Sequence, residues 1–320
     1  INTDELGEDG VWPVEPADAA AFKSRIVVQR PIEDAAFNGT VVVEWFNVSG
    51  GLDAAPDFMQ MHTEIFREGH VWVGVSAQLV GVEGAPDGLF DLSLKAVDPT
   101  RYGSLSHPGD SFSYDIFSQA AQAVRNPVGL DPLQGLQVKR MIAVGESQSA
   151  GRLATYFNAI HPTVELFDGF IIHSRGGGSS ALSQAPQAEI PTPNPTFERT
   201  DLQEPVIGLQ TESDLFLLNS ITMRQPDTGN YRLWEVAGSA HSDVYTTFKG
   251  PDDKGDDPTV ADVIERPEAQ EPFIVCSKPV NDGPGHWVAK AILAAVDSWI
   301  RTGQDAPSAP RLDVNPEGTG

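Results

Sequence analysis

Residues 140–151 have the sequence RMIAVGESQSAG, which says more about the fold than any other segment of this chain. A short apolar run ends in Gly-Glu-Ser-Gln-Ser, and a helical pattern follows at once. This pattern predicts that Ser147 is carried on a sharp turn between a strand and a helix. Such a turn requires small neighbours, and Gly145, Ser149 and Gly151 meet that requirement. The side chain of Ser147 would point away from the sheet, near the partial positive charge of the new helix.

Strand-like and helix-like patterns alternate along the chain on both sides of this turn. The alternation predicts an α/β fold, with a mostly parallel central sheet and helices on both faces. The expected strands are residues 22–29, 40–46, 71–75, 138–144, 167–173, 205–210 and 231–236. The expected helices are residues 57–68, 114–124, 148–160 and 287–300.

Two long segments show neither period. Residues 81–113 are rich in Gly, Pro and Asp, and residues 174–204 contain three successive glycines. Long loops within a compact domain are often binding loops or lids. We therefore expect one domain over residues 1–320, with these two insertions forming a cap near the active site.

Composition restricts the class of ligand. The chain has 320 residues, 21 basic and 45 acidic side chains, and a net charge of −24. This charge disfavours nucleic acid and anionic membranes as partners and favours a neutral small molecule. It fits a salty habitat or a need for solubility. No apolar run reaches the roughly 18 residues that a membrane helix requires. The single cysteine, Cys276, excludes an internal disulfide and a cysteine-based metal site.

Cellular location stays open at this point. The sequence begins at Ile1 rather than at Met, so either an N-terminal segment was removed or the sequence was trimmed. It contains no recognisable signal peptide. Because many secreted enzymes lack disulfides, we slightly favour a secreted or periplasmic location over a cytoplasmic one.

A serine nucleophile needs a histidine to accept its proton and a carboxylate to orient that histidine. Glu212 and Asp214 follow the strand expected at 205–210, and His241 follows the strand expected at 231–236. The order serine, acid, histidine, each past a strand end, is the one found in enzymes with this type of turn. We favour Asp214, the tenth residue counted from position 205, and keep Glu212 as the alternative.

An oxyanion formed at Ser147 would require two backbone N–H donors. One belongs to Gln148, the residue after the serine. The other should come from the loop after the strand expected at 40–46, where we favour Val48 and keep Ser49 as the alternative. Gly50 and Gly51 follow in that loop and permit a close approach of substrate.

Three further side chains need an interpretation. Glu146 precedes the serine directly, and we expect it to be buried and bonded to backbone rather than catalytic. His107 lies in the first insertion and His173 ends the strand expected at 167–173. Either histidine could line the pocket without taking part in the reaction.

With these residues in hand, the chain resembles the α/β-hydrolase superfamily, and more closely a group of bacterial proteins called alpha/beta hydrolase domain proteins. The resemblance covers nearly the whole chain and is carried by residues 43–51, 98–110, 145–149 and 234–241. It implies ester hydrolysis without naming a substrate. The group typically runs longer at its C-terminus, which implies that this chain is shortened there. The chain departs from the commoner lipase pattern at Ser149, in place of glycine, and at Phe46-Asn47, in place of His-Gly.

The leading hypothesis is a serine carboxylesterase that forms an acyl intermediate on Ser147 and needs no cofactor or metal. An acyltransferase that uses the same intermediate is the alternative, since the sequence cannot separate water from another acceptor. A peptidase lacks an evident peptide-gripping domain, and a dehalogenase would carry aspartate in place of Ser147. A binding protein on an inactive scaffold would lack one of the three residue types, and all three are present.

Overall fold

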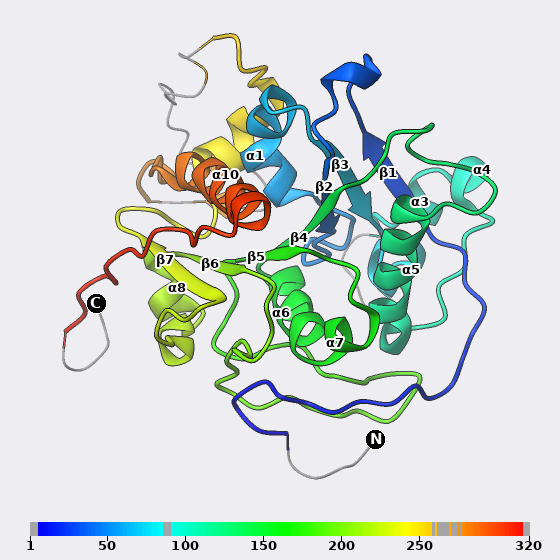
Figure 1. Cartoon of the computed structure of the whole chain (residues 1–320), viewed down its shortest axis with the longest axis horizontal. Helices are drawn as coiled ribbons and strands as arrows, with labels where there is room; N and C mark the ends of the chain where they lie inside the picture. The colour runs from blue at the N-terminus through cyan, green and yellow to red at the C-terminus, as the bar shows by residue number, and fades with distance from the viewer. Residues whose placement is uncertain are drawn as a thin grey trace.

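A computed structural model of the chain describes residues 6–85, 91–257, 260, 269–270, 274–275 and 277–315. Ile1 and Cys276, on which two of the expectations above depend, lie outside these residues, as does part of the first insertion. The described residues contain a seven-stranded sheet in the order β1-β3-β2-β4-β5-β6-β7 (Figure 1). They also contain a two-stranded sheet, formed by β8 (Ala269–Gln270) and β9 (Ile274–Val275).

The large sheet is parallel except at one edge. Its strands are β1 (Ile26–Gln29), β2 (Thr40–Trp45), β3 (Val71–Val75), β4 (Arg140–Glu146), β5 (Gly169–His173), β6 (Val206–Thr211) and β7 (Tyr231–Val236). Only the β1–β3 pair is antiparallel. The predicted α/β class with a mostly parallel sheet is confirmed.

Strand order reverses direction between β2 and β4. From β2 the chain steps outward to β3, and after β3 it crosses back to start β4 on the other side of β2. The loops after β2 and β4 therefore leave the sheet in opposite directions, and in open α/β sheets such a switch point is where ligands bind. The loop after β2 and the turn at Ser147 meet here, because Asn47 Nδ2 donates to Glu146 O.

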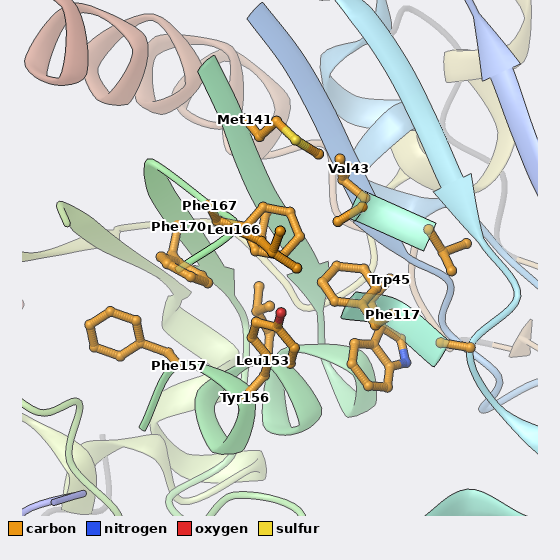
Figure 2. Close-up of a cluster of buried hydrophobic side chains, with 14 of the residues drawn as sticks. Val43, Trp45, Phe117, Met141, Leu153, Tyr156, Phe157, Leu166, Phe167 and Phe170 are labelled. Atoms are coloured by element: carbon orange, nitrogen blue, oxygen red, sulfur yellow. The ribbon is translucent and has the colours of Figure 1, made fainter. Parts of the chain in front are cut away.

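Each face of the sheet buries its own set of apolar side chains, because side chains alternate along a strand. Val41, Val43 and Trp45 point to the face covered by α5 (Ser113–Arg125) and α6 (Gln148–Thr155). Figure 2 shows this cluster, in which Trp45 packs against Phe117. Side chains of the alternate register point to the face covered by α1 (Pro56–Arg67) and α10 (Gly285–Thr302). Figure 1 shows the two helix layers on opposite sides of the sheet.

Several predicted boundaries differ from the observed ones. The strand expected to end at 144 continues to Glu146, because Gly145 and Glu146 pair with β5. The helix expected over 148–160 is α6 followed by a π-helical turn (Tyr156–Ile160) and by α7 (His161–Val164). Pro162 at the start of α7 has no N–H to donate, so a regular α-helical ladder cannot run through this point.

The first insertion contains short helices that periodicity did not predict. They are α2 (Leu79–Glu83), α3 (Leu94–Val97), α4 (Pro99–Tyr102) and a 3₁₀ turn (Asp110–Phe112). Four- or five-residue helices are too short to show an amphipathic period. Side chains cap two of them instead, because Ser93 Oγ accepts a hydrogen bond from Ala96 N and Asp98 Oδ1 accepts one from Arg101 N.

The second insertion contains no helix or strand, as expected, and is held by a buried arginine. The guanidinium of Arg175 donates to Glu198 Oε1 at 2.7 Å and to Thr196 O at 2.6 Å. It also donates to the carbonyls of Gly176, Gly177 and Gly178. Both charged side chains of this ion pair are almost fully buried. Arg175 therefore supplies the hydrogen bonds that a helix or strand would otherwise provide.

Candidate active site

Ser147 lies at the turn between β4 and α6 in a strained backbone conformation. Its φ of 57° and ψ of −116° are rare for a residue with a side chain. Its amide donates to His173 O on β5 at 2.8 Å, which fixes the turn to the neighbouring strand. A Cβ on Gly145 would lie 3.0 Å from Ser149 O, so the turn leaves little room beyond glycine at that position. The strain is maintained because the flanking strand and helix are both buried.

Ser149, which departs from the usual glycine, bonds to the turn itself. Its hydroxyl donates to Glu146 O at 2.8 Å and accepts a hydrogen bond from Glu146 N at 3.0 Å. The side chain is fully buried, so these two bonds replace the water that the hydroxyl loses. The departure from the pattern therefore leaves the geometry of the turn intact.

His241 lies between the serine and a carboxylate. Its Nε2 is 3.0 Å from Ser147 Oγ, and its Nδ1 is 2.7 Å from Asp214 Oδ1. Both distances lie within hydrogen-bond range, as a nucleophile, a base and an orienting acid require. The structure thus brings together three side chains that are 27 and 94 residues from one another along the chain.

The structure also separates the two candidate acids. Asp214 Oδ2 accepts hydrogen bonds from Ser174 Oγ at 2.6 Å and from Thr211 N at 2.7 Å, which leaves Oδ1 for His241. Glu212 faces the loop rather than the imidazole, because its Oε2 accepts a hydrogen bond from Gly238 N at 2.8 Å. Asp214 therefore contacts the histidine, and Glu212 holds the loop that carries it.

Charges around the site favour a charged Asp214 and a protonated His241. Burial acts to raise the pKa of Asp214, but the hydrogen bonds from His241, Ser174 and Thr211 outweigh it, and the net pKa is lowered. Burial acts to lower the pKa of His241, but Asp214 and Glu146 outweigh it, and the net pKa is raised. An imidazolium that forms at His241 is therefore stabilised by its surroundings.

The loop of His241 is fixed at several points. Its amide donates to Ser213 Oγ at 2.8 Å, and Ser239 Oγ donates to Val236 O at 2.7 Å. Asn281 Nδ2 donates to Gly238 O at 3.0 Å from the segment that precedes α10. Sequence patterns did not identify Ser174, Ser213 or Asn281 as contacts of the triad residues or their loop, because each contact joins segments that are far apart in the chain.

Of the two candidate oxyanion donors in the loop after β2, the Ser49 amide already makes a hydrogen bond within the protein. Ser49 N donates to Asn47 Oδ1 at 2.8 Å, so this amide has a partner within the protein. Within the described part of the chain, the amides of Val48 and Gln148 donate no hydrogen bond. Asn47 itself was not predicted to act here, although its position two residues past the carboxyl end of β2 was a usable signal.

Glu146 differs from what was expected of it. It is buried, as predicted, but its carboxyl group bonds to a side chain rather than to backbone: Asn47 Nδ2 donates to Glu146 Oε2 at 3.2 Å. The other oxygen, Oε1, lies 3.5 Å from His241 Nε2. Burial raises the pKa of Glu146 to about 7, although His241 and His173 act to lower it.

The remaining candidate histidines are engaged elsewhere. His107 Nε2 pairs with Ala77 O at 2.9 Å, and its Nδ1 accepts a hydrogen bond from Gly109 N. His173 Nδ1 pairs with Asp57 Oδ1 at 2.8 Å, and both side chains are buried behind the turn. Within the described residues, neither imidazole makes a hydrogen bond to Ser147 or His241.

Among the described residues, no group of three or more His, Cys, Asp or Glu side chains is arranged to hold a metal ion. No described helix has both the length and the apolar composition to cross a membrane.

The fold and the site define an α/β protein that carries a histidine-paired serine at the topological switch point of its sheet. A family model described as "Alpha/beta hydrolase domain" matches residues 1–319, so the chain belongs to this family. The resemblance seen in the sequence is therefore confirmed. Comparison with curated proteins finds no match.

Solved structures with some likeness include a serine hydrolase without a lid from Xanthomonas campestris, at 14% identity and a TM-score of 0.39 over 74% of this chain and 92% of that one. A fungal esterase from Rhizomucor miehei has 12% identity and a TM-score of 0.44 over 89% and 85%. An esterase from Pyrobaculum calidifontis has 12% identity and a TM-score of 0.45 over 86% and 81%. TM-scores and identities this low say nothing about the reaction of this protein. Its assignment to the alpha/beta hydrolase family therefore rests on the family model alone.

Proposed function

We propose that this protein is a serine carboxylesterase in which Ser147, His241 and Asp214 act as nucleophile, base and orienting acid. The observation that carries the proposal is the position of the His241 imidazole, 3.0 Å from Ser147 Oγ and 2.7 Å from Asp214 Oδ1. The strained backbone of Ser147 supports it, because strain of this kind is typical of nucleophile turns in this fold.

The reaction would proceed in two halves. Ser147 Oγ attacks the ester carbonyl while His241 Nε2 takes its proton, and Asp214 stabilises the imidazolium. Collapse of the tetrahedral intermediate passes that proton to the leaving alcohol and leaves an acyl group on Ser147. His241 then activates water, which releases the acid and restores the free serine. The amides of Gln148 and Val48 would bind the oxyanion in both halves.

The substrate class follows from charge and from the second insertion. With a net charge of −24, the protein repels polyanions, so we propose a neutral small-molecule ester. Ser174, the first residue of the insertion 174–204, donates to the triad carboxylate at 2.6 Å. We therefore propose that this insertion forms part of the wall of the site within a single domain.

The first test is hydrolysis of p-nitrophenyl esters, from acetate to palmitate, by the wild type and by Ser147→Ala. We expect kcat to fall by at least about 10⁴-fold in the variant, because the nucleophile is lost. Unchanged thermal unfolding would show that the variant is folded. The chain-length optimum of the wild type would measure the acyl pocket.

Two results would contradict the proposal. Activity that survives in a folded Ser147→Ala would remove the nucleophile assignment. A wild type that neither hydrolyses any ester of the series nor reacts with a fluorophosphonate at Ser147 would remove the esterase assignment.

A further inference from the structure

A second carboxylate lies beside the imidazole of His241, on the side opposite Asp214. Glu146 is the last residue of β4 and is only 7% exposed, and its Oε1 lies 3.5 Å from His241 Nε2. The same nitrogen is 3.0 Å from Ser147 Oγ. Glu146 Oε1 and Ser147 Oγ therefore both lie near the one nitrogen that must accept and return the proton.

The position of this carboxyl group is fixed by Asn47. The Asn47 side-chain amide donates to Glu146 O at 3.0 Å and to Glu146 Oε2 at 3.2 Å. Because Oε2 is engaged in this way, Oε1 is the oxygen directed at His241. The opposite end of the same side chain, Asn47 Oδ1, accepts a hydrogen bond from Ser49 N at 2.8 Å. Asn47 thus joins the carboxylate to the loop that offers the Val48 amide.

A carboxylate in this position acts differently on the two states of the imidazole. In the resting state, Nε2 of neutral His241 presents a lone pair to the serine hydroxyl, and Glu146 adds no hydrogen bond to it. After proton transfer, Nε2 carries a proton and the ring is positive, so a carboxylate oxygen within about 4 Å is attractive. The interaction is therefore stronger in the transition state than in the ground state, which is the condition for faster reaction.

We propose that Glu146 is a positioning residue for the reaction: its carboxylate, held by Asn47, stabilises protonated His241 from the Nε2 side while Asp214 does so from the Nδ1 side. This inference rests on the proposed function, in which His241 is the base. Glu146 does not need to gain or lose a proton during the cycle, because it stabilises protonated His241 only by the negative charge that it places near Nε2.

The charged groups that face Glu146 come from four elements. His241, in the loop after β7, and His173, on β5, lower its pKa, whereas Asp57 on α1 and Asp214 on α8 (Glu212–Leu217) raise it. Burial has the largest effect, and the resulting pKa is about 7. Glu146 is thus mostly ionised above neutral pH. Its charge in turn raises the pKa of His241, so its removal must lower that pKa.

The test compares Glu146→Gln with the wild type in the pH dependence of ester hydrolysis. Glutamine keeps the shape and an oxygen acceptor for Asn47 but cannot ionise. We expect the acid limb of the kcat profile to move down by about one pH unit and the plateau of kcat to fall up to about tenfold. A matched control is Asp115→Asn, which removes a carboxylate on α5, away from the site, and should leave the acid limb where it is.

A second readout needs no substrate. The titration of the His241 ring by NMR, assigned by comparison with His241→Gln, should give a lower pKa in Glu146→Gln than in the wild type. Because this shift is measured without turnover, absence of esterase activity would contradict the proposed function, whereas the shift would still show that Glu146 stabilises protonated His241. The converse outcome, activity with no shift in either readout, would overturn the assignment alone.

A purely structural role would give a different pattern. Lower stability or a lower kcat with an unmoved acid limb and an unmoved His241 titration would show that Glu146 only supports the turn. If Glu146→Gln does not fold, Glu146→Asp serves instead, since it keeps the charge one methylene further from His241. A smaller downward shift of the acid limb would then support the proposal, and no shift would overturn it.

Discussion

At the scale of single residues, the candidate site depends on which carboxylate oxygens and which backbone amides already make hydrogen bonds within the protein. Asp214 can serve His241 because Ser174 and Thr211 hold its second oxygen. Glu212, only two positions earlier, is bound to Gly238 N. Both carboxylates lie close to the loop of His241, and only one is directed at its ring. Hydrogen bonding, more than position in the chain, therefore separates their roles.

This separation predicts different effects for two similar substitutions. Asp214→Asn should lower kcat by about 10⁴-fold, because the imidazole loses its orienting acceptor and takes the wrong tautomer. Glu212→Gln keeps an oxygen acceptor for Gly238 N and should lower kcat by less than about tenfold. Steady-state hydrolysis of the best p-nitrophenyl ester measures both. If Glu212→Gln were the more damaging variant, Glu212 would be the acid.

At the scale of elements, the second insertion shows how a segment without helix or strand is held in place. Arg175 is fully buried, and its guanidinium donates hydrogen bonds to Glu198, to Thr196 O and to three successive glycine carbonyls. Ser174 directly precedes this arginine and donates a hydrogen bond to Asp214. The bonds that fix Arg175 therefore also help to fix a contact of the candidate active site.

Loss of Arg175 should lower the stability of the folded protein. Arg175→Met leaves Glu198 as an unpaired buried charge, so we expect the free energy of unfolding to fall by about 3–5 kcal/mol. Urea unfolding followed by tryptophan fluorescence measures the change. The double variant Arg175→Met/Glu198→Leu should recover part of the loss, because both charges are removed together. A single variant within about 1 kcal/mol of the wild type would show that the ion pair does not hold the insertion.

At the scale of the whole molecule, topology places the site and charge selects what approaches it. The strand order reverses between β2 and β4, and Asn47 and Ser147 lie at the carboxyl ends of these two strands. The net charge of −24 makes the molecule as a whole repel polyanions. The same charge opposes the compact state, because like charges repel one another more strongly when folded together.

Self-repulsion of this size predicts a dependence of stability on salt. Raising the ionic strength from about 0.01 M to 1 M shortens the screening length from about 30 Å to 3 Å. We therefore expect the melting temperature to rise over this range, and to rise equally in sodium and potassium chloride at the same ionic strength. Calorimetry in the two salts tests this. A falling melting temperature would mean that the ion pairs outweigh the repulsion.

Much of the fold could be predicted because it depends on local patterns. β-branched runs and amphipathic spacing located the strands of the large sheet and its main helices, and β3 and β7 have the predicted bounds. The short helices of the first insertion were not predicted, because a single turn shows no period. The end of β4 was missed by two residues, because its pairing with β5 is a contact between distant segments.

The sequence alone also predicted Ser147 and His241 as site residues and reduced the acid to Asp214 or Glu212, because their residue types and their places after strands are local properties. It favoured Asp214 over Glu212 from position alone, and it did not predict that Glu146 lies beside His241. Which carboxylate oxygen faces an imidazole depends on hydrogen bonds made by β4, β6 and α8, by the segments just after β2 and β5, and by the loop of His241. Those bonds form only when the chain has packed, since the partners lie up to 99 residues apart. Local pattern therefore determined the fold and the candidate residues, and tertiary packing determined how their charges act on one another.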